Sequence, residues 1–322
     1  MRSVDRVPSF VTVGETMAVF IRDPDGPADR YQLTAAGSES NVAIGLAGLG
    51  VRARWLSRLG QDDLGRFVHD FVAGYGVEVE VAWDATRPTA SCVKEVQASG
   101  SRMRYYRSTS AARRLDLLDL AAVGDADHLH LTGVTPALSS EDRDVVRAVL
   151  DRREGTGRTS FDVNYRPQLW AGAEQAAAEL VPLAQAADIV FIGDDEARWL
   201  LGTDDPAEVA DLLLRREDQE LVLKGGEGAA MLLTQDGDPV VEPAHRVEVV
   251  DLTGAGDAFA AGYLAARFWG WSPRARLRTG HLLASRVIGV VSDIGPRLDD
   301  TELADLSRTT GERLPETIGG RA

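Results

Sequence analysis

The sequence predicts an α/β protein built around a mainly parallel sheet, and three observations favour this fold class. Short apolar runs alternate with helical periodicity over most of the chain, as they do in β-α-β units. A hydrophobic content of 44% is enough for a sizeable core, and 322 residues suit one large domain or two smaller ones. Two segments, at about residues 15–34 and 88–108, break the alternation because their pattern is of strands and turns without helices.

The amino-terminal elements follow from apolar runs that end at turn residues. Strands are expected over residues 10–13, 54–58 and 77–81, and helices over residues 41–49 and 62–74. The second of these helices has a carboxylate-rich start, which favours a helix amino end.

The carboxy-terminal elements continue the same order. We expect strands over residues 128–131, 159–162, 189–191 and 221–223, and helices over residues 141–153, 174–185 and 206–216. Strands joined through helices form parallel pairs, so helices should cover both faces of the sheet. The residues from 309 to 322 are predicted to form a flexible tail.

The second break in the alternation predicts a β-hairpin. Residues 93–97 and 102–107 are strand-like and flank a turn-forming stretch at residues 98–101. Such a hairpin is either a flap over a ligand site or an edge hairpin without a role, and its pattern alone does not separate the two.

Charge and cysteine content exclude several classes of protein. A net charge of −15 argues against general nucleic-acid binding, which needs a basic surface, so any anionic ligand must meet local cations or amides. The single cysteine, Cys92, forms no internal disulfide and suits a reducing compartment. We see neither a signal peptide nor an apolar run long enough to cross a membrane, and a cytoplasmic protein is expected.

The strongest chemical motif is DLTGAGDAF, at residues 251–259. A helix amino end presents unpaired N–H groups and a partial positive charge, so the amides of Gly254, Ala255 and Gly256 could hold an anion. Asp257 would lie beside that anion and could take a proton from a hydroxyl, which suits phosphoryl transfer to an alcohol. The plainer alternative is a structural helix with a glycine entry and an acidic first turn. The chain has neither a P-loop motif nor a dinucleotide-binding glycine motif that would compete.

A family resemblance rests on this motif and on a second one far upstream. DLTGAGDAF resembles the signature D-T-T-G-A-G-D-x-F of the ribokinase-like (PfkB) carbohydrate kinases, with Leu252 as the departure. AGSESNVA, at residues 36–43 and followed by Gly50 and Gly60, resembles their amino-terminal signature, with Glu39 in place of a small residue. The resemblance covers about residues 10–296.

The resemblance implies an architecture and a reaction. The fold would be a three-layer α/β/α core within a single domain over residues 1–308, with a small β-sheet lid made from the two breaks in the alternation. ATP, Mg²⁺ and a sugar would meet at the carboxyl ends of the strands. Asp257 carries over as the catalytic base, Gly254–Gly256 as the anion hole, and Gly37 and Asn41 as sugar-binding residues.

The resemblance also implies residues around the nucleotide and its metal. The nucleotide-side residues would be Lys224, Gly226 and Gly228 of the KGGEG stretch, Gly254 and Gly256, and His281. Glu196 would organise water bound to Mg²⁺, although Gly193 replaces the Asn of the family's N-x-x-E motif. Many members use K⁺ near the anion hole, and Asp251 is its candidate neighbour here.

Two further stretches bear on the sugar. YYRSTSAA, at residues 105–112, and FDVNYRPQLW, at residues 161–170, resemble the 2-keto-3-deoxygluconate kinases within the family. A sugar acid needs a guanidinium fork for its carboxylate, which Arg107 and Arg166 would supply, with Tyr105 at the same end. The alternatives are an exposed lid arginine and a loop arginine paired with a nearby acid. Cys92 stands where related sugar-acid kinases carry tyrosine and is interpreted as a small buried residue.

The leading hypothesis is an ATP-dependent kinase that converts 2-keto-3-deoxygluconate to its 6-phosphate. The alternatives are a fructokinase, another keto-sugar or nucleoside kinase of the family, or a ligand sensor without turnover. The exposed lid edge favours a homo-oligomer. His128 and His130 share one strand face but lack a third metal ligand in the sequence, so they are interpreted as structural. Lysine is scarce, since only Lys94 and Lys224 occur.

Overall fold

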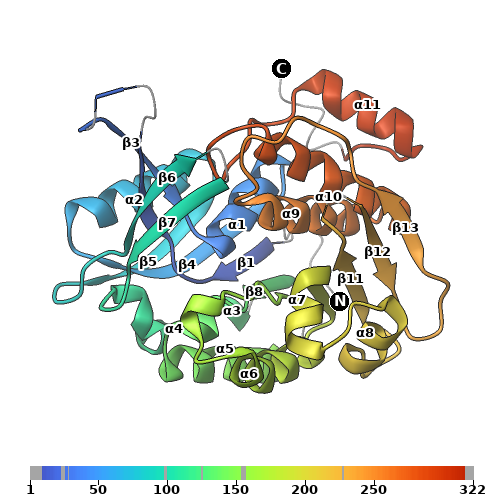
Figure 1. Ribbon diagram of the computed structural model, residues 1–322, viewed down its shortest axis with the longest axis horizontal. Helices are drawn as coiled ribbons and strands as arrows, with labels where there is room; N and C mark the ends of the chain where they lie inside the picture. Colours follow the sequence, from blue (N-terminus) through green and yellow to red (C-terminus); the bar gives the residue numbers. More distant parts are fainter. Residues whose placement is uncertain are drawn as a thin grey trace, which may run out of the picture.

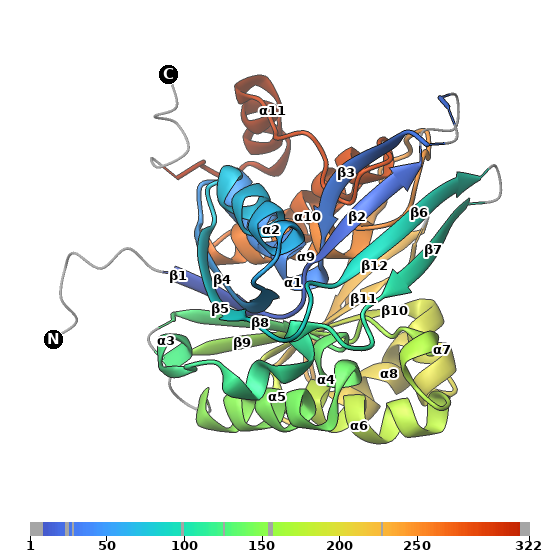
Figure 2. The ribbon, with the colours of Figure 1, turned by 90° about the vertical axis from the view of Figure 1, so that its left-hand side faces the viewer.

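The computed structural model describes residues 9–315 except residues 23–25, 28, 98–99, 125, 154–156 and 227. A nine-stranded sheet forms the centre, in the order β13-β12-β11-β10-β9-β8-β1-β4-β5 (Figures 1 and 2). The strands from β5 to β11 in this order pair in parallel, and β12 and β13 complete the sheet as antiparallel strands. The strand bounds are β1 Ser9–Val13, β4 Arg52–Gly60, β5 Glu78–Asp84, β8 His128–Thr132, β9 Arg158–Asp162, β10 Ile189–Gly193, β11 Glu220–Lys224, β12 Ala229–Leu233 and β13 Val240–Pro243.

Helices cover both faces of this sheet and make three layers (Figure 2). One face carries α1 Ser38–Gly48, α2 Asp63–Gly74, α9 Ala255–Phe268, α10 Pro273–Ile288 and α11 Asp300–Thr310. The other face carries α3 Ala121–Gly124, α4 Thr135–Leu138, α5 Ser140–Arg153, α6 Ala173–Ala186, α7 Asp194–Leu201 and α8 Pro206–Leu213. The predicted α/β/α core is therefore confirmed.

The strands of the sheet are apolar on both faces, as a doubly covered sheet requires. Phe10 and Val11 are neighbours on β1, yet they belong to opposite hydrophobic cores. Trp55 and Leu56 divide in the same way on β4. Alternate side chains of a strand point to opposite faces, so continuous apolar runs produce two cores.

The two breaks in the alternation form one small sheet beside the core (Figure 1). Its strands are β2 Met17–Arg22, β3 Tyr31–Ala36, β6 Ser91–Gln97 and β7 Gly100–Tyr106, in the order β3-β2-β6-β7. Two antiparallel hairpins, β2–β3 and β6–β7, join through parallel pairing of β2 with β6. We call this four-stranded sheet the lid. Cys92 lies buried in its small apolar core, where burial raises the pKa of the thiol to about 11, as suits a structural residue.

Several boundaries differ from the predictions by a few residues, and two of them have a clear physical cause. Helix α8 ends at Leu213 rather than at residue 216, because the N–H groups of Arg215 and Arg216 donate to the Gln219 side chain at 2.6 and 2.8 Å. The tail expected from residue 309 does not begin there. Helix α11 extends to Thr310, and the Trp271 indole donates to the carbonyl oxygen of Arg313 at 3.1 Å. Residues 316–322 lie outside the described residues.

Helix length and polarity also bear on membrane insertion. Within the described part of the chain, every helix is too short or too polar to span a bilayer.

Candidate active site

A cleft of about 850 Å³ opens at the carboxyl ends of the central strands. Asp162, Gly193 and Lys224 are the last residues of β9, β10 and β11, and all three line it. Met103 and Tyr105 of the lid strand β7 line the same cleft. This volume suits a ligand of nucleotide size, and the position is the usual one for ligands in open parallel sheets.

The glycine turn before α9 forms one wall of the cleft. Gly254 has φ +83°, and a Cβ there would lie 2.4 Å from the backbone oxygen of Asp293, so the position requires glycine. The first-turn N–H groups of α9 have no acceptor inside the helix and carry a partial positive charge. Gly254, Ala255 and Gly256 all line the cleft. Of these, the N–H of Ala255 donates within the turn to the carbonyl oxygen of Leu252 at 3.3 Å.

Asp257 lies in this first turn and is held by polar side chains from two other elements. Ser38 donates to Oδ1 at 2.6 Å and Asn41 donates to Oδ2 at 2.9 Å, both from the start of α1. Asn164, after β9, also donates to Oδ1 at 3.2 Å. Only 6% of Asp257 is exposed, and burial raises its pKa to about 6 against the opposing hydrogen bonds of Ser38 and Asn41. The carboxylate is thereby fixed in orientation and made more basic.

Lys224 brings a cation to the same wall. Its Nζ lies 2.7 and 2.9 Å from the two carboxylate oxygens of Asp162. It also lies 3.4 Å from the position that a Cβ on Gly256 would take. Burial opposes the charged form, but the carboxylates of Asp162 and Glu196 outweigh it and raise the pKa of Lys224. An ammonium therefore stands beside the amides of the predicted anion hole.

Three residues of the site were missed by the sequence reasoning, namely Ser38, Asp162 and Asn164. Asn164 has φ +40°, a left-handed conformation that asparagine tolerates better than most side chains. Its amide donates to Ser38 at 2.7 Å and links that hydroxyl to Asp257. All three lie in or beside stretches already identified, and a polar residue directly after a buried strand was the available signal.

The residues predicted for the sugar gather in an adjoining hollow that also contains Asp257. Its lining includes Tyr105, Arg107, Arg166, Gly37 and Asn41. Arg107 is only 11% exposed in its side chain, so the alternative of an exposed lid arginine is wrong. Its Nη2 lies 2.5 Å from Oε2 of the buried Glu15, and its guanidinium lies 5.7 Å from the Tyr105 ring centroid.

Both arginines have hydrogen-bond donors that the described residues leave unused. The Nε of Arg107 is buried and has no hydrogen-bond partner among the described residues. Arg166 is exposed, and no ion pair with an acid is found for it in the described part of the chain. Two guanidinium groups beside Asp257 can thus receive an anionic oxygen.

Glu39, the departure from the amino-terminal signature, has a structural explanation. It is fully buried, and its Oε1 accepts hydrogen bonds from Thr132 and Thr135, both at 2.7 Å. Gly14 makes room for it, since a Cβ there would lie 2.2 Å from the carboxyl carbon of Glu39. Burial raises the pKa of Glu39 to about 7. The larger side chain is accommodated by a glycine and two hydroxyls.

Glu196 lines the cleft, and the start of α7 fixes its orientation. Its two carboxylate oxygens accept the N–H groups of Tyr165 and Gly193, both at 2.7 Å. Burial raises its pKa. A Cβ at Gly193 would lie 2.6 Å from Oδ1 of Asp195, so the glycine that replaces the family's asparagine leaves space for that side chain.

Asp251, the candidate neighbour of a K⁺ ion, is paired with a lysine of the lid. Its Oδ2 lies 2.6 Å from Nζ of Lys94, and its Oδ1 accepts from the Thr253 hydroxyl at 2.8 Å. A side-chain ammonium therefore lies against this carboxylate, and a K⁺ ion beside Asp251 stays a prediction.

The remaining predicted residues divide between the cleft and the scaffold. Gly226 and His281 line the cleft, and His281 donates through Nε2 to the carbonyl of Glu242 at 3.0 Å. Burial lowers the pKa of His281, so the ring is neutral. Gly228 is not among the cleft-lining residues; its N–H donates to Gly225 and shapes the loop.

The paired strand histidines belong to the scaffold. His128 and His130 both hydrogen-bond Ser160 Oγ at 2.8 Å, which confirms that they share a face. His128 also stacks on Phe10 at 4.5 Å. Over the described residues, no three His, Cys, Asp or Glu side chains gather as a metal cage.

The chain is similar in sequence to known carbohydrate kinases. Residues 7–300 match the family model of pfkB family carbohydrate kinases. The 2-dehydro-3-deoxygluconokinase of Bacillus subtilis is 33% identical over 88% of this chain and 90% of its own length. The fructokinase of Klebsiella pneumoniae is 32% identical over 75% of this chain and 79% of its own.

A solved structure shares the whole architecture. An Escherichia coli protein described as ribokinase II, in complex with ATP and Mg²⁺, superposes with a TM-score of 0.81 at 20% identity. The alignment covers 94% of this chain and 99% of the E. coli chain. The fold, the extent of the family match and the identity to its members agree, and the chain belongs to the pfkB family of carbohydrate kinases.

Proposed function

We propose that this protein transfers a phosphoryl group from ATP to the terminal hydroxyl of a sugar acid, and that 2-keto-3-deoxygluconate is converted to its 6-phosphate. The observation that carries the proposal is the hollow in which Arg107 and Arg166 lie with Asp257. A neutral sugar gives the Arg166 guanidinium no charge to pair with, whereas a sugar carboxylate does. Arg107 is paired with Glu15 and would add its remaining hydrogen-bond donors. The B. subtilis relative, named as a kinase of this sugar acid, supports the same substrate class.

The geometry supports a direct displacement. Asp257 takes the proton of the C6 hydroxyl while the C6 oxygen bonds to the γ-phosphorus of ATP. At the same time, the bond between that phosphorus and the bridging oxygen breaks, and ADP leaves. The amides of Gly254 and Gly256 and the ammonium of Lys224 stabilise the negative charge on the transferred group. Ser38 and Asn41 hold the base in place. The products are the sugar 6-phosphate and ADP, with the proton on Asp257.

The donor set fits Mg²⁺ carried by the nucleotide. Mg²⁺ keeps several waters and binds phosphates with one or two carboxylates, so a protein cage of three ligands is not needed. Asp162 and Glu196 both line the cleft. Asp162 is paired with Lys224 and Glu196 accepts two N–H groups, and both keep carboxylate lone pairs beyond these bonds. They would hold the waters of the ion, which neutralises charge on the triphosphate when bound. The E. coli complex supports ATP and Mg²⁺ as cofactors.

The pH dependence of kcat should follow the ionisation of the Asp257 carboxyl group. A general base must be ionised, and its pKa of about 6 is raised above the ordinary aspartate value. At saturating substrates, kcat should therefore be flat above pH 7 and fall about tenfold per pH unit well below the pKa. Initial rates of ADP release between pH 5 and pH 8 measure this profile. A rate that stayed constant down to pH 5 would speak against Asp257 as the base.

Arg107 and Arg166 should distinguish a sugar acid from a neutral sugar. Changing either residue to Ala should raise KM for 2-keto-3-deoxygluconate by about tenfold or more, as expected for loss of a charged hydrogen bond. Fructose is the matched control, since its KM should change less than threefold in Arg166→Ala. The Arg107 variant also unpairs Glu15, so the comparison rests first on Arg166. Unchanged sugar-acid KM in both variants would remove the sugar-acid assignment.

A coupled assay of ADP release over sugar acids, ketohexoses, pentoses and nucleosides tests the substrate class. We expect the highest kcat/KM for 2-keto-3-deoxygluconate. A preference for fructose would identify a fructokinase, and a preference for nucleosides would identify a nucleoside kinase. If ATP or sugar bound but no acceptor led to ADP release, the protein would be a ligand sensor without turnover.

The exposed edges of the lid suit the association of two copies of this chain. Its edge strand β3 exposes Tyr31 and Leu33, and β7 exposes Tyr106. Apolar side chains on an exposed sheet edge favour pairing with a second copy, and we propose a homo-oligomer through the lid. Light scattering of the purified chain measures its mass, and a monomer at micromolar concentration would contradict it. The single buried cysteine is consistent with the reducing cytoplasm.

A further inference from the structure

Lys94 carries a charge from the lid into the core. It lies on the lid strand β6, yet none of its side chain is exposed. Its Nζ lies 2.6 Å from Oδ2 of Asp251, 2.9 Å from Oδ1 of Asp293 and 2.9 Å from the carbonyl oxygen of Val291. Three oxygens from two core loops therefore surround one ammonium of the lid.

This environment keeps Lys94 charged. Burial opposes the ammonium, but the carboxylates of Asp293 and Asp251 outweigh burial and raise its pKa. An ammonium has three N–H donors, and here three oxygens face them. Two carboxylates and a carbonyl around a compact cation are also the oxygen ligands that a hard monovalent ion would take.

The two loops held by Lys94 shape the amino end of α9. Asp251 accepts hydrogen bonds from the N–H and hydroxyl of Thr253, directly before Gly254. Gly254 in turn packs on the backbone of Asp293. A Cβ added to Gly254 would lie only 2.4 Å from the backbone oxygen of Asp293. Ser101 of β7 donates to Asp251 at 2.9 Å, so both strands of the lid hairpin reach this point.

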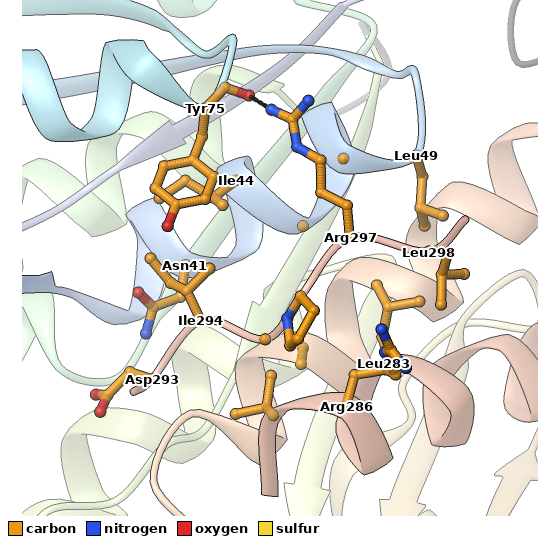
Figure 3. A pocket seen from close by; sticks show the side chains of 16 residues that line it. Asn41, Ile44, Leu49, Tyr75, Leu283, Arg286, Asp293, Ile294, Arg297 and Leu298 are labelled. Carbon is orange, nitrogen blue, oxygen red and sulfur yellow. Dashed lines mark hydrogen bonds between the residues drawn. The ribbon is translucent and has the colours of Figure 1, made fainter. Parts of the chain in front are cut away.

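The loop that contains Asp293 is fixed at its far end as well. Figure 3 shows it running from Asp293, near Asn41, along an apolar pocket to Arg297. There Arg297 donates to the carbonyl oxygen of Tyr75 at 2.6 Å. With one end anchored on the scaffold, the position of Asp293 beside Gly254 depends on what neutralises its carboxylate at the other end.

We propose that Lys94 is a built-in replacement for a monovalent cation, which positions the amides before α9 and makes their alignment depend on the seated lid. The role in phosphoryl transfer rests on the function proposed above. The enzyme then works without K⁺, because its cation is tethered to the chain. Lys94 is a positioning residue, since it acts on the transferred group through Gly254 rather than by contact.

The choice of residue supports this reading. The chain has 35 basic residues, of which only Lys94 and Lys224 are lysines, and both ammonium groups lie against carboxylates at this site. A planar guanidinium directs its donors in a fork, whereas an ammonium is a compact point charge that suits a ring of oxygens. Arginine serves the other ion pairs, both exposed ones such as Arg52 with Glu78 and buried ones such as Arg107 with Glu15.

The test compares wild type, Lys94→Met and Lys94→Arg in tetramethylammonium, Na⁺, K⁺ and NH₄⁺ chloride at equal ionic strength. Wild-type kcat should be equal in all four salts within about twofold. Lys94→Met should lose about 10²-fold in kcat in tetramethylammonium, the size expected for a misaligned anion-hole donor. K⁺ or NH₄⁺ should restore it by about tenfold, because these ions fit the vacated oxygens, whereas Lys94→Arg should not respond.

A second readout needs no turnover and separates this proposal from the proposed function. The thermal midpoint of Lys94→Met should rise in K⁺ or NH₄⁺ relative to tetramethylammonium, and that of wild type should not. Arg104→Met, which removes an exposed lid ion pair with Glu95, is the matched control and should show no cation response. A K⁺ requirement in wild type would overturn the proposal, as would a Lys94→Met variant whose midpoint ignores K⁺ and NH₄⁺.

Discussion

Replacing Asp257 with Asn should lower kcat by at least about 10²-fold while sugar and nucleotide still bind. Asn has nearly the same shape as Asp but cannot accept a proton, so the loss falls on the chemical step. The carboxylate also accepts hydrogen bonds from Ser38 and Asn41, and the new amide must present an NH₂ group to one of these donors. Steady-state ADP release gives kcat, and calorimetric titration gives both binding constants.

Asp142→Asn is the matched control for this experiment. Asp142 is also a fully buried carboxyl whose pKa is raised by burial, to about 7, but it lies outside the cleft and accepts from the N–H of Leu115. Its variant should change stability and leave kcat within about twofold of wild type. If Asp257→Asn kept full turnover, Asp257 would lose the role of base. If it lost binding as well as turnover, the carboxylate would be a ligand contact instead.

Gly254→Ala should reduce kcat by about 10²- to 10³-fold, the effect of removing one anion-hole donor. The φ of +83° costs an L-residue about 1–2 kcal/mol. The added Cβ would also lie 2.4 Å from the Asp293 oxygen, so either the turn or the Asp293 loop must move. Either movement displaces the amides that face the phosphoryl group, and kcat should fall more than KM for the sugar.

Gly76→Ala separates backbone strain from the loss of the site. Gly76 has almost the same φ, +84°, but a Cβ there would meet no atom within 4 Å, and it lies between α2 and β5. Its variant should lose about 1 kcal/mol of unfolding free energy and keep its kcat. Equal kcat in the two variants would show that the turn before α9 does not hold the transferred group.

Local pattern was enough to predict the layered fold. Buried parallel strands are often continuous apolar runs, so residues 189–192 of β10 and residues 221–223 of β11 stand out from their flanking polar residues. The lid could be predicted because the side chains of its hairpin strands alternate in polarity. The end of α8 was misplaced because a distant side chain, Gln219, takes the N–H groups that would have continued the helix. Such a contact leaves no trace in helical periodicity.

The candidate site was predictable only where its residues are close together in the sequence. Asp257 and the glycines beside it lie within nine consecutive residues, so their chemistry can be recognised locally. Ser38 and Asn164 reach Asp257 across 219 and 93 residues, and only the folded chain brings them together. Lys94 is the extreme case, since a lysine on an alternating lid strand suggests a solvated side chain rather than a cation buried between two loops.

In the proposed reaction, the α9 amino end and Asp257 transfer a phosphoryl group to the C6 hydroxyl, which lies at the opposite end of the sugar acid from its carboxylate. Phosphorus NMR of a reaction containing the protein, ATP, Mg²⁺ and 2-keto-3-deoxygluconate tests it most directly. We expect ADP together with one phosphomonoester, whose phosphorus couples to the two protons on C6. Phosphate attached to any other carbon, or ATP split to inorganic phosphate with the sugar unchanged, would contradict it.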